Sequence, residues 1–349
     1  MRLLILTQKI DIHDPILGFF HRWVEEFANN CEKVTVICLQ KGQFNLPENV
    51  KILSLGKENG ESRLKYLINF YKYIWSERKN YDSVFVHMNP IYLVWGGIFW
   101  KIFGKKTSLW YTHKNIDLKL KIAVKFSDVI FSASKESFRM MTKKLQIVGH
   151  GIPVESFRNT QNFSHDLTNK FRMISVGRIT KIKNLDVLIR ACAILKKKNL
   201  KFETCLIGPV VGKDDEKYLK YLNELISEND LSQEIKFIGS VSNDRIAQYN
   251  WYCDLSINLA PTGGVDKAVL ESMASGSLVL ASNLAFEEYF GKYKDILMFK
   301  EGDEKDLADK IMNLVSRNDT KSIRSFLQFS VKEKTDLVVL VLKIISKIS

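Results

Sequence analysis

The sequence is poor in cysteine and contains no long hydrophobic run. Its five cysteines are odd in number and include no C-x-x-C pair: Cys31, Cys38, Cys192, Cys205 and Cys253. This pattern indicates neither a disulfide framework nor a zinc site. The longest apolar stretch, residues 91–100, is well short of the roughly 20 residues of a membrane span. The opening residues lack the cleavage site of a signal peptide. These absences predict a globular chain in a reducing cytosol.

Patterns that bind metal ions are also scarce. No D-x-D motif follows a predicted strand. Asp214 and Asp215 lie at the predicted start of a charged helix, where acidic residues are typically solvated or cap the helix. The six histidines show no ligand spacing: His13, His21, His87, His113, His150 and His165. We therefore expect no bound metal.

The length and the charge of the chain are informative. It has 349 residues, 46% of them hydrophobic, which is enough for two domains of about 150 residues, each with a core. Residues 1–165 contain 24 Lys and Arg against 14 Asp and Glu, a balance of +10, whereas residues 166–349 contain 28 against 25, a balance of +3. The basic first half predicts an anionic partner, such as anionic lipid or a phosphorylated acceptor. No nucleic-acid-binding motif accompanies it, so we expect no nucleic acid.

Apolar, strand-like runs alternate with helical segments in both halves. In the first half we expect strands at residues 3–7, 33–39, 50–55, 82–88, 107–113 and 128–134, and helices near 18–28, 63–78, 91–103 and 118–126. In the second half we expect strands at 171–177, 202–208, 235–239, 255–260 and 277–282, and helices near 185–198 and 214–229. Strands that alternate with long helices form a parallel sheet covered on both faces.

This order predicts an α/β chain with two Rossmann-like parallel-sheet domains. We place the first domain at residues 1–165 and the second at 166–318, with a polar linker at 158–170. Residues 319–349 contain a final amphipathic helix, which we expect to pack back on the first domain.

A glycine-rich turn opens a short apolar helix at residues 261–276, PTGGVDKAVLESMASG. Gly263 and Gly264 let the backbone approach a ligand closely. A helix that begins near Val265 or Asp266 presents unpaired N–H groups and its positive dipole end to an anion. Glu271 lies further along, where a carboxylate can accept hydrogen bonds from both hydroxyls of a ribose. The segment suits a nucleotide diphosphate, and an ordinary loop-to-helix junction is the alternative.

A second candidate anion site follows the first strand of the second half. The segment GRITKIKN, residues 177–184, places a glycine turn at the carboxyl end of a parallel strand, the edge at which such sheets bind ligands. Arg178 offers a planar fork of donors and Lys183 a mobile charge, so the pair can grip a diphosphate. Solvated loop cations are the alternative.

Taken in order, these segments resemble the second domain of family 4 glycosyltransferases of the GT-B fold. The resemblance spans residues 171–315 and rests on GRITKIKN, on residues 235–262, and on the glycine turn with Glu271. The first domain matches more loosely, through Gly18, His113 and GHGIPVESF at 149–157. The resemblance implies two domains that face each other across a cleft. It also implies a retaining hexosyltransferase that uses a UDP- or GDP-sugar and neither metal nor cofactor.

Carried over by position, the resemblance gives roles to individual residues. Arg178 and Lys183 would hold the diphosphate and stabilise the leaving group, and His113 would reach across the cleft to the transferred sugar. Glu271 would bind the ribose hydroxyls. The remaining donor-binding candidates would lie beside the base or around the phosphates: Gly18, Gly177, Phe237, Ile238, Gly263, Gly264, Val265, Asp266 and Lys267.

One position departs from the family pattern. The family carries a glutamate where this chain has Gly263, so no carboxylate at this place can contact the sugar. Asp266 and Lys267 lie in the same turn and are candidates for part of that role. Cations remain the main requirement, because breaking the anomeric bond leaves negative charge on the diphosphate.

The first half interleaves aromatic and basic residues in two segments, 63–79 and 95–106. Such a surface suits anionic lipid headgroups, although a helix core with a solvated basic edge explains either segment alone. We expect a cytoplasmic protein, held peripherally at the inner face of the membrane. The expected acceptor is a glycolipid or a cell-envelope glycan, as in polysaccharide or lipopolysaccharide biosynthesis.

Two other functions stay open. A nucleotide-sugar-binding protein without turnover is consistent with Gly263 in place of the glutamate. A sugar-nucleotide epimerase shares the two-domain architecture, but it needs acid and base residues that the sequence does not reveal.

Overall fold

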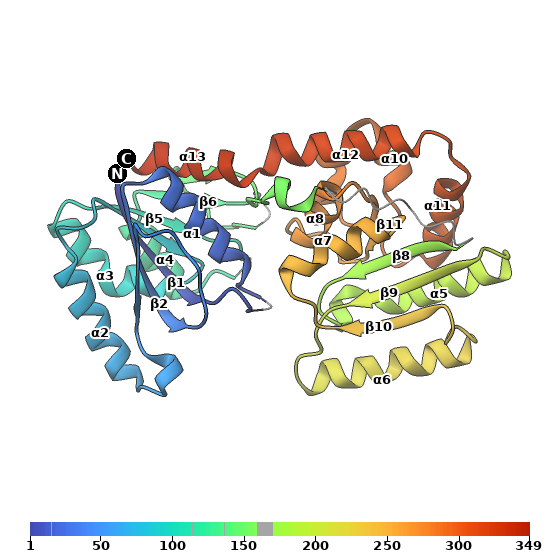
Figure 1. Ribbon diagram of the computed structural model, residues 1–349, viewed down its shortest axis with the longest axis horizontal. Coiled ribbons are helices and arrows are strands. Elements are labelled where there is room, and N and C mark those ends of the chain that lie inside the picture. Colours follow the sequence, from blue (N-terminus) through green and yellow to red (C-terminus); the bar gives the residue numbers. More distant parts are fainter. Residues whose placement is uncertain (15, 114, 136, 159–169) are drawn as a thin grey trace. The chain divides into compact units, whose positions relative to one another are not determined.

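The computed structural model describes residues 1–14, 16–113, 115–135, 137–158 and 170–349. The chain forms two compact units, shown in Figure 1. The first unit combines Met1–Pro153 with Thr335–Ser349, and the second is Val154–Lys334. The linker expected at 158–170 and the boundary expected at residue 165 lie mostly outside the described residues. The short segment Val154–Phe157 groups with the second unit.

The first unit contains a seven-stranded sheet in the order β3-β2-β1-β4-β5-β6-β7, in which every neighbouring pair is parallel. The strands are β1 (Arg2–Ile10), β2 (Lys33–Lys41), β3 (Val50–Ser54), β4 (Ser83–His87), β5 (Lys106–Trp110), β6 (Val129–Ser132) and β7 (Leu145–Ile147). Strand β1 shows why the sheet needs a helical layer on each face, because Leu3 and Ile5 lie in one core cluster and Leu4 and Leu6 in the other, all fully buried.

Helices α1 and α13 cover one face of this sheet, and α2, α3 and α4 cover the other. Their bounds are α1 (Phe19–Asn30), α2 (Arg63–Ser76), α3 (Ile91–Ile102), α4 (Leu118–Phe126) and α13 (Leu337–Ile348). Helix α13 begins at Asp336, whose side chain accepts a hydrogen bond from the Val338 backbone N–H at 2.9 Å. Its inward residues Leu340, Val341 and Ile344 are buried in the same cluster as α1.

The second unit contains a five-stranded parallel sheet in the order β10-β9-β8-β11-β12. The strands are β8 (Phe171–Val176), β9 (Phe202–Ile207), β10 (Ile235–Gly239), β11 (Leu255–Asn258) and β12 (Leu278–Ala281). The helices are α5 (Leu185–Lys197), α6 (Lys213–Glu228), α7 (Asn243–Tyr252), α8 (Lys267–Ala274), α9 (Glu287–Phe290), α10 (Lys294–Leu297), α11 (Glu304–Ser316) and α12 (Thr320–Thr335). The chain moves outward from β8 in one direction through β9 and β10, then returns to the other side for β11 and β12.

Every strand expected from the sequence is present, and the prediction of two Rossmann-like parallel sheets is confirmed. The sequence analysis did not predict β7, α7, α9, α10 or α11. The single final helix expected within 319–349 is instead two helices, of which α12 lies almost wholly in the second unit and α13 in the first. Among the described residues, none of the helices combines the length and the hydrophobicity that a membrane crossing requires.

Candidate functional site

The candidate site lies at the carboxyl edge of the second sheet, between β8 and β11. These neighbouring strands are the point at which the strand order reverses, which is where open parallel sheets generally form a ligand-binding crevice. The loop after β8 contains Arg178 and Lys183, and the loop after β11 contains the glycine turn and Asp266. The Asn184 side chain joins the two loops by donating to the Leu259 carbonyl at 3.2 Å.

Lys183 forms an ion pair with Asp266 across this crevice. The Asp266 carboxylate also accepts a hydrogen bond from the Asn258 side-chain amide at 3.0 Å. Burial alone would raise the pKa of Asp266, but Lys183 and Asn258 outweigh burial and hold the pKa below its usual value. The crevice therefore contains an ionised carboxylate that neutralises the lysine predicted to bind a diphosphate.

Asn258 is a site residue that the sequence reading missed. It is the last residue of β11, and it is buried. Its Oδ1 atom has no hydrogen-bond partner among the residues that the structure describes. A polar residue at the carboxyl end of a central parallel strand is the signal that would have identified it.

Arg178 has a carboxylate partner of its own. Its Nε atom lies 3.6 Å from Oδ2 of Asp215, in the first turn of α6. Asp215 was expected to be solvated or to cap the helix, and the solvated alternative was wrong because the side chain is buried. The Asp215 carboxylate also accepts the Val211 backbone N–H at 3.3 Å, so it fixes the loop after β9 as well as the guanidinium. The Arg178 side chain is half exposed, which leaves its remaining N–H groups accessible.

The glycine turn is held by Asn283, which follows β12. The Gly263 backbone N–H donates to Asn283 Oδ1 at 3.3 Å, and Asn283 Nδ2 donates to the Gly264 carbonyl at 3.0 Å. Helix α8 begins at Lys267, with Asp266 as its N-cap residue, close to the start expected from the sequence. Because the turn has both a donor and an acceptor on Asn283, its backbone has a defined position before any ligand binds.

Glu271 is buried in α8, and Lys267 lies one turn earlier. The Lys267 Nζ atom is 3.6 Å from the Glu271 carboxylate. Burial raises the pKa of Glu271, Lys267 opposes this shift, and Asp266 adds to it. Glu271 is thus a carboxylate whose burial is only partly offset by its lysine.

We expect Glu271→Gln to stabilise the unliganded protein at pH 7 by about 1 kcal/mol, because it removes an incompletely paired buried charge. The pKa of Glu271 is higher in the folded chain than in the unfolded chain. The free energy of unfolding of the wild type therefore falls as pH rises from the ordinary range of a carboxyl group through the folded pKa. Thermal unfolding at pH 4 and pH 7 checks this: the gain should be present at pH 7 and nearly absent at pH 4. A loss of stability at pH 7 would contradict it.

Two glycines bring the loops after β8 and β9 into close contact. A Cβ atom on Gly208 would lie 2.0 Å from the Gly177 carbonyl oxygen, and the Gly208 φ angle is +152°. A Cβ atom on Gly177 would approach the Lys183 side chain at 3.3 Å. Gly177 therefore allows Lys183 to lie along the backbone, and Gly208 allows Gly177 to take its position.

Other predicted donor-binding residues lie further along the same edge. Phe237 and Ile238 are half-buried on β10, which is separated from β8 by β9. Gly208 connects the two ends by donating its backbone N–H to the Gly239 carbonyl at 2.9 Å. Phe237 and Ile238 are thus on the predicted edge, but no contact joins them to the Lys183–Asp266 pair among the described residues.

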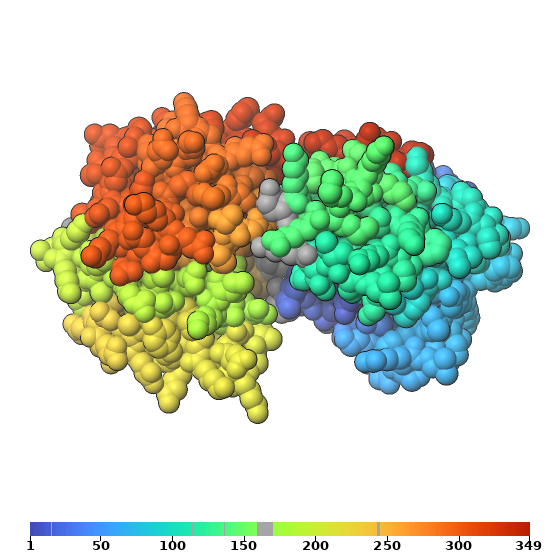
Figure 2. Space-filling model, turned by 180° about the vertical axis from the view of Figure 1, so that it is seen from behind, coloured from blue at the N-terminus to red at the C-terminus, as the bar shows by residue number. Residues whose placement is uncertain are grey.

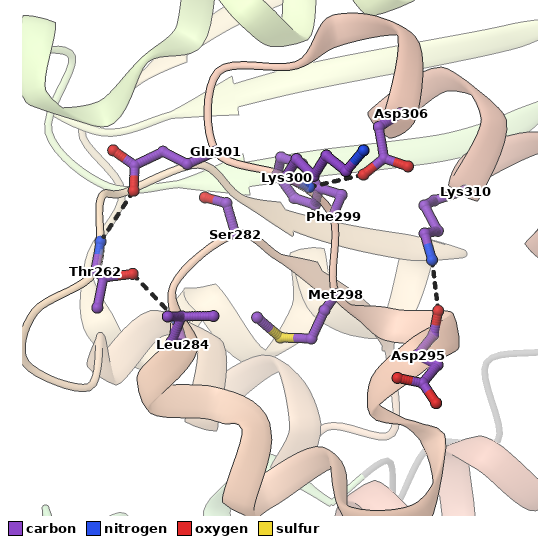
Figure 3. A pocket seen from close by; sticks show the side chains of 10 residues that line it. All are labelled: Thr262, Ser282, Leu284, Asp295, Met298, Phe299, Lys300, Glu301, Asp306 and Lys310. Atoms are coloured by element: carbon purple, nitrogen blue, oxygen red, sulfur yellow. Dashed lines mark hydrogen bonds between the residues drawn. The ribbon is translucent and has the colours of Figure 1, made fainter.

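A pocket of about 560 Å³ adjoins the glycine turn (Figure 3). Thr262 lines it and donates its backbone N–H to the Glu301 carboxylate at 3.3 Å. The Thr262 hydroxyl oxygen accepts the Leu284 N–H at 3.3 Å. The predicted site residues do not line this pocket. Its lining residues Glu301 and Leu284 instead hold Thr262, which directly precedes the two glycines.

Two predicted site residues belong to the first unit. Gly18 directly precedes α1, in the loop after β1. His113 was expected at the end of a strand, but β5 ends at Trp110, and His113 is exposed in the following loop. Its Nδ1 atom accepts the Asn115 backbone N–H at 3.1 Å. In the first sheet, β4 lies between the strands that these two loops follow.

Residues 157–325 match the model of the glycosyl transferases group 1 family. The matched residues lie within the second unit. They include Lys183, Asp266 and helix α8.

Relatives that align over more residues than the family model are also named as glycosyltransferases. The chain is 26% identical to a glycosyltransferase of Methanocaldococcus jannaschii over 216 residues, which are 58% of this chain and 53% of that protein. It therefore spans about half the length of that relative. It is also 26% identical to the N-acetylgalactosamine-N,N'-diacetylbacillosaminyl-diphospho-undecaprenol 4-alpha-N-acetylgalactosaminyltransferase of Campylobacter jejuni, over 277 residues, 71% of this chain and 72% of that protein.

The fold extends over both units. The crystal structure of Anabaena HepE in complex with UDP superposes with a TM-score of 0.80, at 18% sequence identity, over 99% of each chain. A sucrose-phosphate synthase from Thermosynechococcus elongatus superposes with a TM-score of 0.75, at 14% identity. The expected GT-B fold, with its two parallel-sheet domains, is confirmed.

Proposed function

We propose that this protein transfers a sugar from a nucleotide diphosphate to an acceptor hydroxyl, with retention at the anomeric carbon. The observation that carries the proposal is the strand-order reversal, where Lys183 pairs with Asp266 at the start of α8 and Arg178 lies in the same loop as Lys183. The group 1 match covers this crevice, and the crystal structure of HepE is a complex with UDP. We propose a UDP- or GDP-hexose as donor, and UDP-hexoses are the first donors to test.

The proposed chemistry depends on the placement of positive charge. The bond between the anomeric carbon and the diphosphate oxygen breaks, and its electron pair leaves with the diphosphate. Arg178 and Lys183 would stabilise that negative charge where it forms, without a metal ion. The acceptor hydroxyl forms the new bond, and its proton passes to the departing phosphate oxygen. Glu271 would hold the ribose, and His113 would contact the transferred sugar.

We further propose a lipid-linked or cell-envelope glycan as acceptor. The name of the Campylobacter relative contains a diphospho-undecaprenol, which is a lipid-linked acceptor of that enzyme. The basic first half of this chain is consistent with such an acceptor, because a diphospholipid is anionic.

Binding without turnover is the second candidate function, and the Lys183–Asp266 pair favours it. A diphosphate between the two loops must compete with the Asp266 carboxylate for Lys183. Release of nucleotide diphosphate from a panel of UDP- and GDP-sugars, with and without glycolipid extract, separates the two functions. Consumption of a donor with any acceptor supports transfer. Donor binding without consumption under every condition would make the protein a nucleotide-sugar-binding protein.

Asp266→Asn should tighten the binding of UDP or GDP about tenfold, or about 1.4 kcal/mol. The substitution keeps the shape of the side chain but removes the negative charge that neutralises Lys183 and repels a diphosphate. Isothermal titration calorimetry measures the change. Asp214→Asn is the matched control, because it removes the same charge from an exposed position in the same unit and should change the affinity less than about twofold. Weaker binding by Asp266→Asn would show that Asp266 positions Lys183 for the ligand rather than competing with it.

A further inference from the structure

We propose that the outward face of α2 and α3 docks on the surface of an anionic phospholipid bilayer. This docking face consists of Leu64, Ile68 and Trp75 on α2, with Ile98, Ile102 and Phe103 on α3 and at its end. Figure 2 shows α2, in light blue, and α3, in cyan, at the surface of the first unit. The docking face belongs to the first unit alone and does not depend on the transfer reaction.

Helix α2 carries an exposed apolar stripe. Leu64, Ile68, Tyr71 and Trp75 are spaced by four, three and four residues, which places them on one side of the helix. Their exposed fractions are 68%, 52%, 44% and 53%. The buried side of the same helix is formed by Phe70 and Ile74. Helix α2 is therefore apolar on two sides, and only one of them packs against the sheet.

Helix α3 is more extreme, because Lys101 is its one charged residue. Tyr92, Leu93 and Trp100 pack inward, yet Ile98 and Ile102 are 61% and 74% exposed. A helix that is apolar on all sides is usually buried on all sides. Among the described residues, the outer side of α3 is therefore exposed, although the helix has the composition of a buried one.

The two apolar stripes form one continuous surface. The Trp75 ring lies 6.1 Å from the Phe99 ring and 5.9 Å from the Phe103 ring, centroid to centroid. The Tyr71 hydroxyl donates to the Trp95 carbonyl at 2.9 Å, which fastens α2 to α3. Contiguous exposed apolar surface of this kind marks a site of interaction rather than scattered surface residues.

The helices that form and adjoin the docking face carry charge of one sign. Helices α2, α3 and α4 contain no Asp or Glu, whereas they contain two lysines and an arginine, one lysine, and three lysines, respectively. All seven cations are exposed. Helix α4 adjoins α3, since a Cβ atom on Gly97 would lie 2.3 Å from the Phe126 side chain. Arg78 adds a further cation, 4.3 Å above the Trp75 ring.

The positive charge of these helices indicates which partner binds the docking face. A second copy of the chain, joined by a two-fold axis through this face, would bring cations against cations. Anionic lipid headgroups complement the lysines, and the interfacial layer accepts tryptophan and aliphatic side chains. The sequence reading emphasised aromatic residues here, but Phe70 and Trp100 are fully buried. The aliphatic residues Leu64, Ile68, Ile98 and Ile102 provide much of the exposed apolar surface instead.

Flotation with phosphatidylcholine vesicles that contain about 30% phosphatidylglycerol tests the docking face. The full chain should float with these vesicles, should not float with pure phosphatidylcholine, and should be released by high salt. Ile98→Gln with Ile102→Gln should lower the bound fraction about tenfold, and Lys72→Glu with Lys101→Glu should do the same. Leu342→Gln is the matched control, because Leu342 is 48% exposed on α13, the helix that packs on the other face of the sheet.

Unchanged thermal midpoints should show that these exposed substitutions leave the fold intact. Absence of binding to anionic vesicles, or binding that neither double variant reduces, would overturn the proposal. A dimer in size-exclusion chromatography that Ile98→Gln with Ile102→Gln dissociates, without vesicle binding, would assign the face to a second copy instead. UDP binding in solution should be equal in all these proteins. Its absence from the wild type would count against the proposed function and leave the docking face untouched.

Discussion

Replacing Lys183 with alanine should lower the rate of sugar transfer by about 10²- to 10³-fold, the effect of removing one preorganised charge from a leaving group. The Lys183 side chain lies close to the backbone of Gly177, which has no Cβ atom to obstruct it. It also forms an ion pair with Asp266, in the loop after β11. The loss should appear in kcat as well as in donor affinity, because negative charge on the diphosphate grows as the anomeric bond breaks. Release of nucleotide diphosphate under saturating donor measures it.

The adjacent Lys181 provides the control. It belongs to the same short turn but is exposed, so Lys181→Ala should keep the wild-type rate within about twofold. Lys183→Ala also leaves the half-buried Asp266 carboxylate without its lysine and should lower stability. The double variant Lys183→Ala with Asp266→Asn should regain that stability while the rate stays low. If the double variant regains the rate as well, Lys183 acts on the fold and not on the reaction.

Gly208→Ala should destabilise the second unit by about 3 kcal/mol or more and abolish donor binding. The new Cβ atom would lie 2.0 Å from the Gly177 carbonyl oxygen, and a backbone atom cannot move aside as the end of a flexible side chain can. The loop that carries Arg178 and Lys183 would have to shift away from the strand ends. Urea unfolding and UDP titration measure the two effects.

Comparison of Gly208→Ala with Gly212→Ala distinguishes the effect of steric contact from the effect of backbone strain. Gly212 has a φ angle of +86°, and a Cβ atom there would meet nothing within 4 Å. An alanine at this position should cost about 1–2 kcal/mol for its backbone conformation and leave UDP binding intact. Equal losses of stability in Gly208→Ala and Gly212→Ala would indicate that the steric contact with Gly177 contributes little to the effect of Gly208→Ala.

Much of the fold was predictable because buried parallel strands have nearly continuous apolar sequences. Leu3–Leu6 and Leu278–Ala281 are fully or almost fully buried on both faces, so their composition alone indicates their place. Strand β7 lacks this signal, because Leu145 and Gln146 are only half-buried and Ile147 is exposed. The expected strand at 107–113 ended early at Trp110, since its apolar sequence continues into the loop that carries His113.

The candidate site was predictable for residues that adjoin a strand end or a glycine turn. Gly177 and Arg178 follow β8 directly and Lys183 lies in the same loop, so local sequence is sufficient to place them. Asp215 was not predictable in this way. Its burial and its pairing with Arg178 result from the packing of α6 beside the loop after β8, and no spacing in the sequence encodes that contact. The pairing of Lys183 with Asp266 joins residues far apart in the chain and likewise depends on the order of the strands.

The core of the first unit is completed by α13, and this has a consequence for biosynthesis. Leu337, Leu340, Val341, Ile344 and Ile348 fill the cluster beneath α1, and the backbone of Leu337 donates to the Ile152 carbonyl at 2.9 Å. Residues 1–153 leave the ribosome long before these side chains are made. The second unit, whose residues are contiguous, can finish folding while the first still has an open apolar face. The unit whose synthesis begins first is therefore the unit whose folding is completed last.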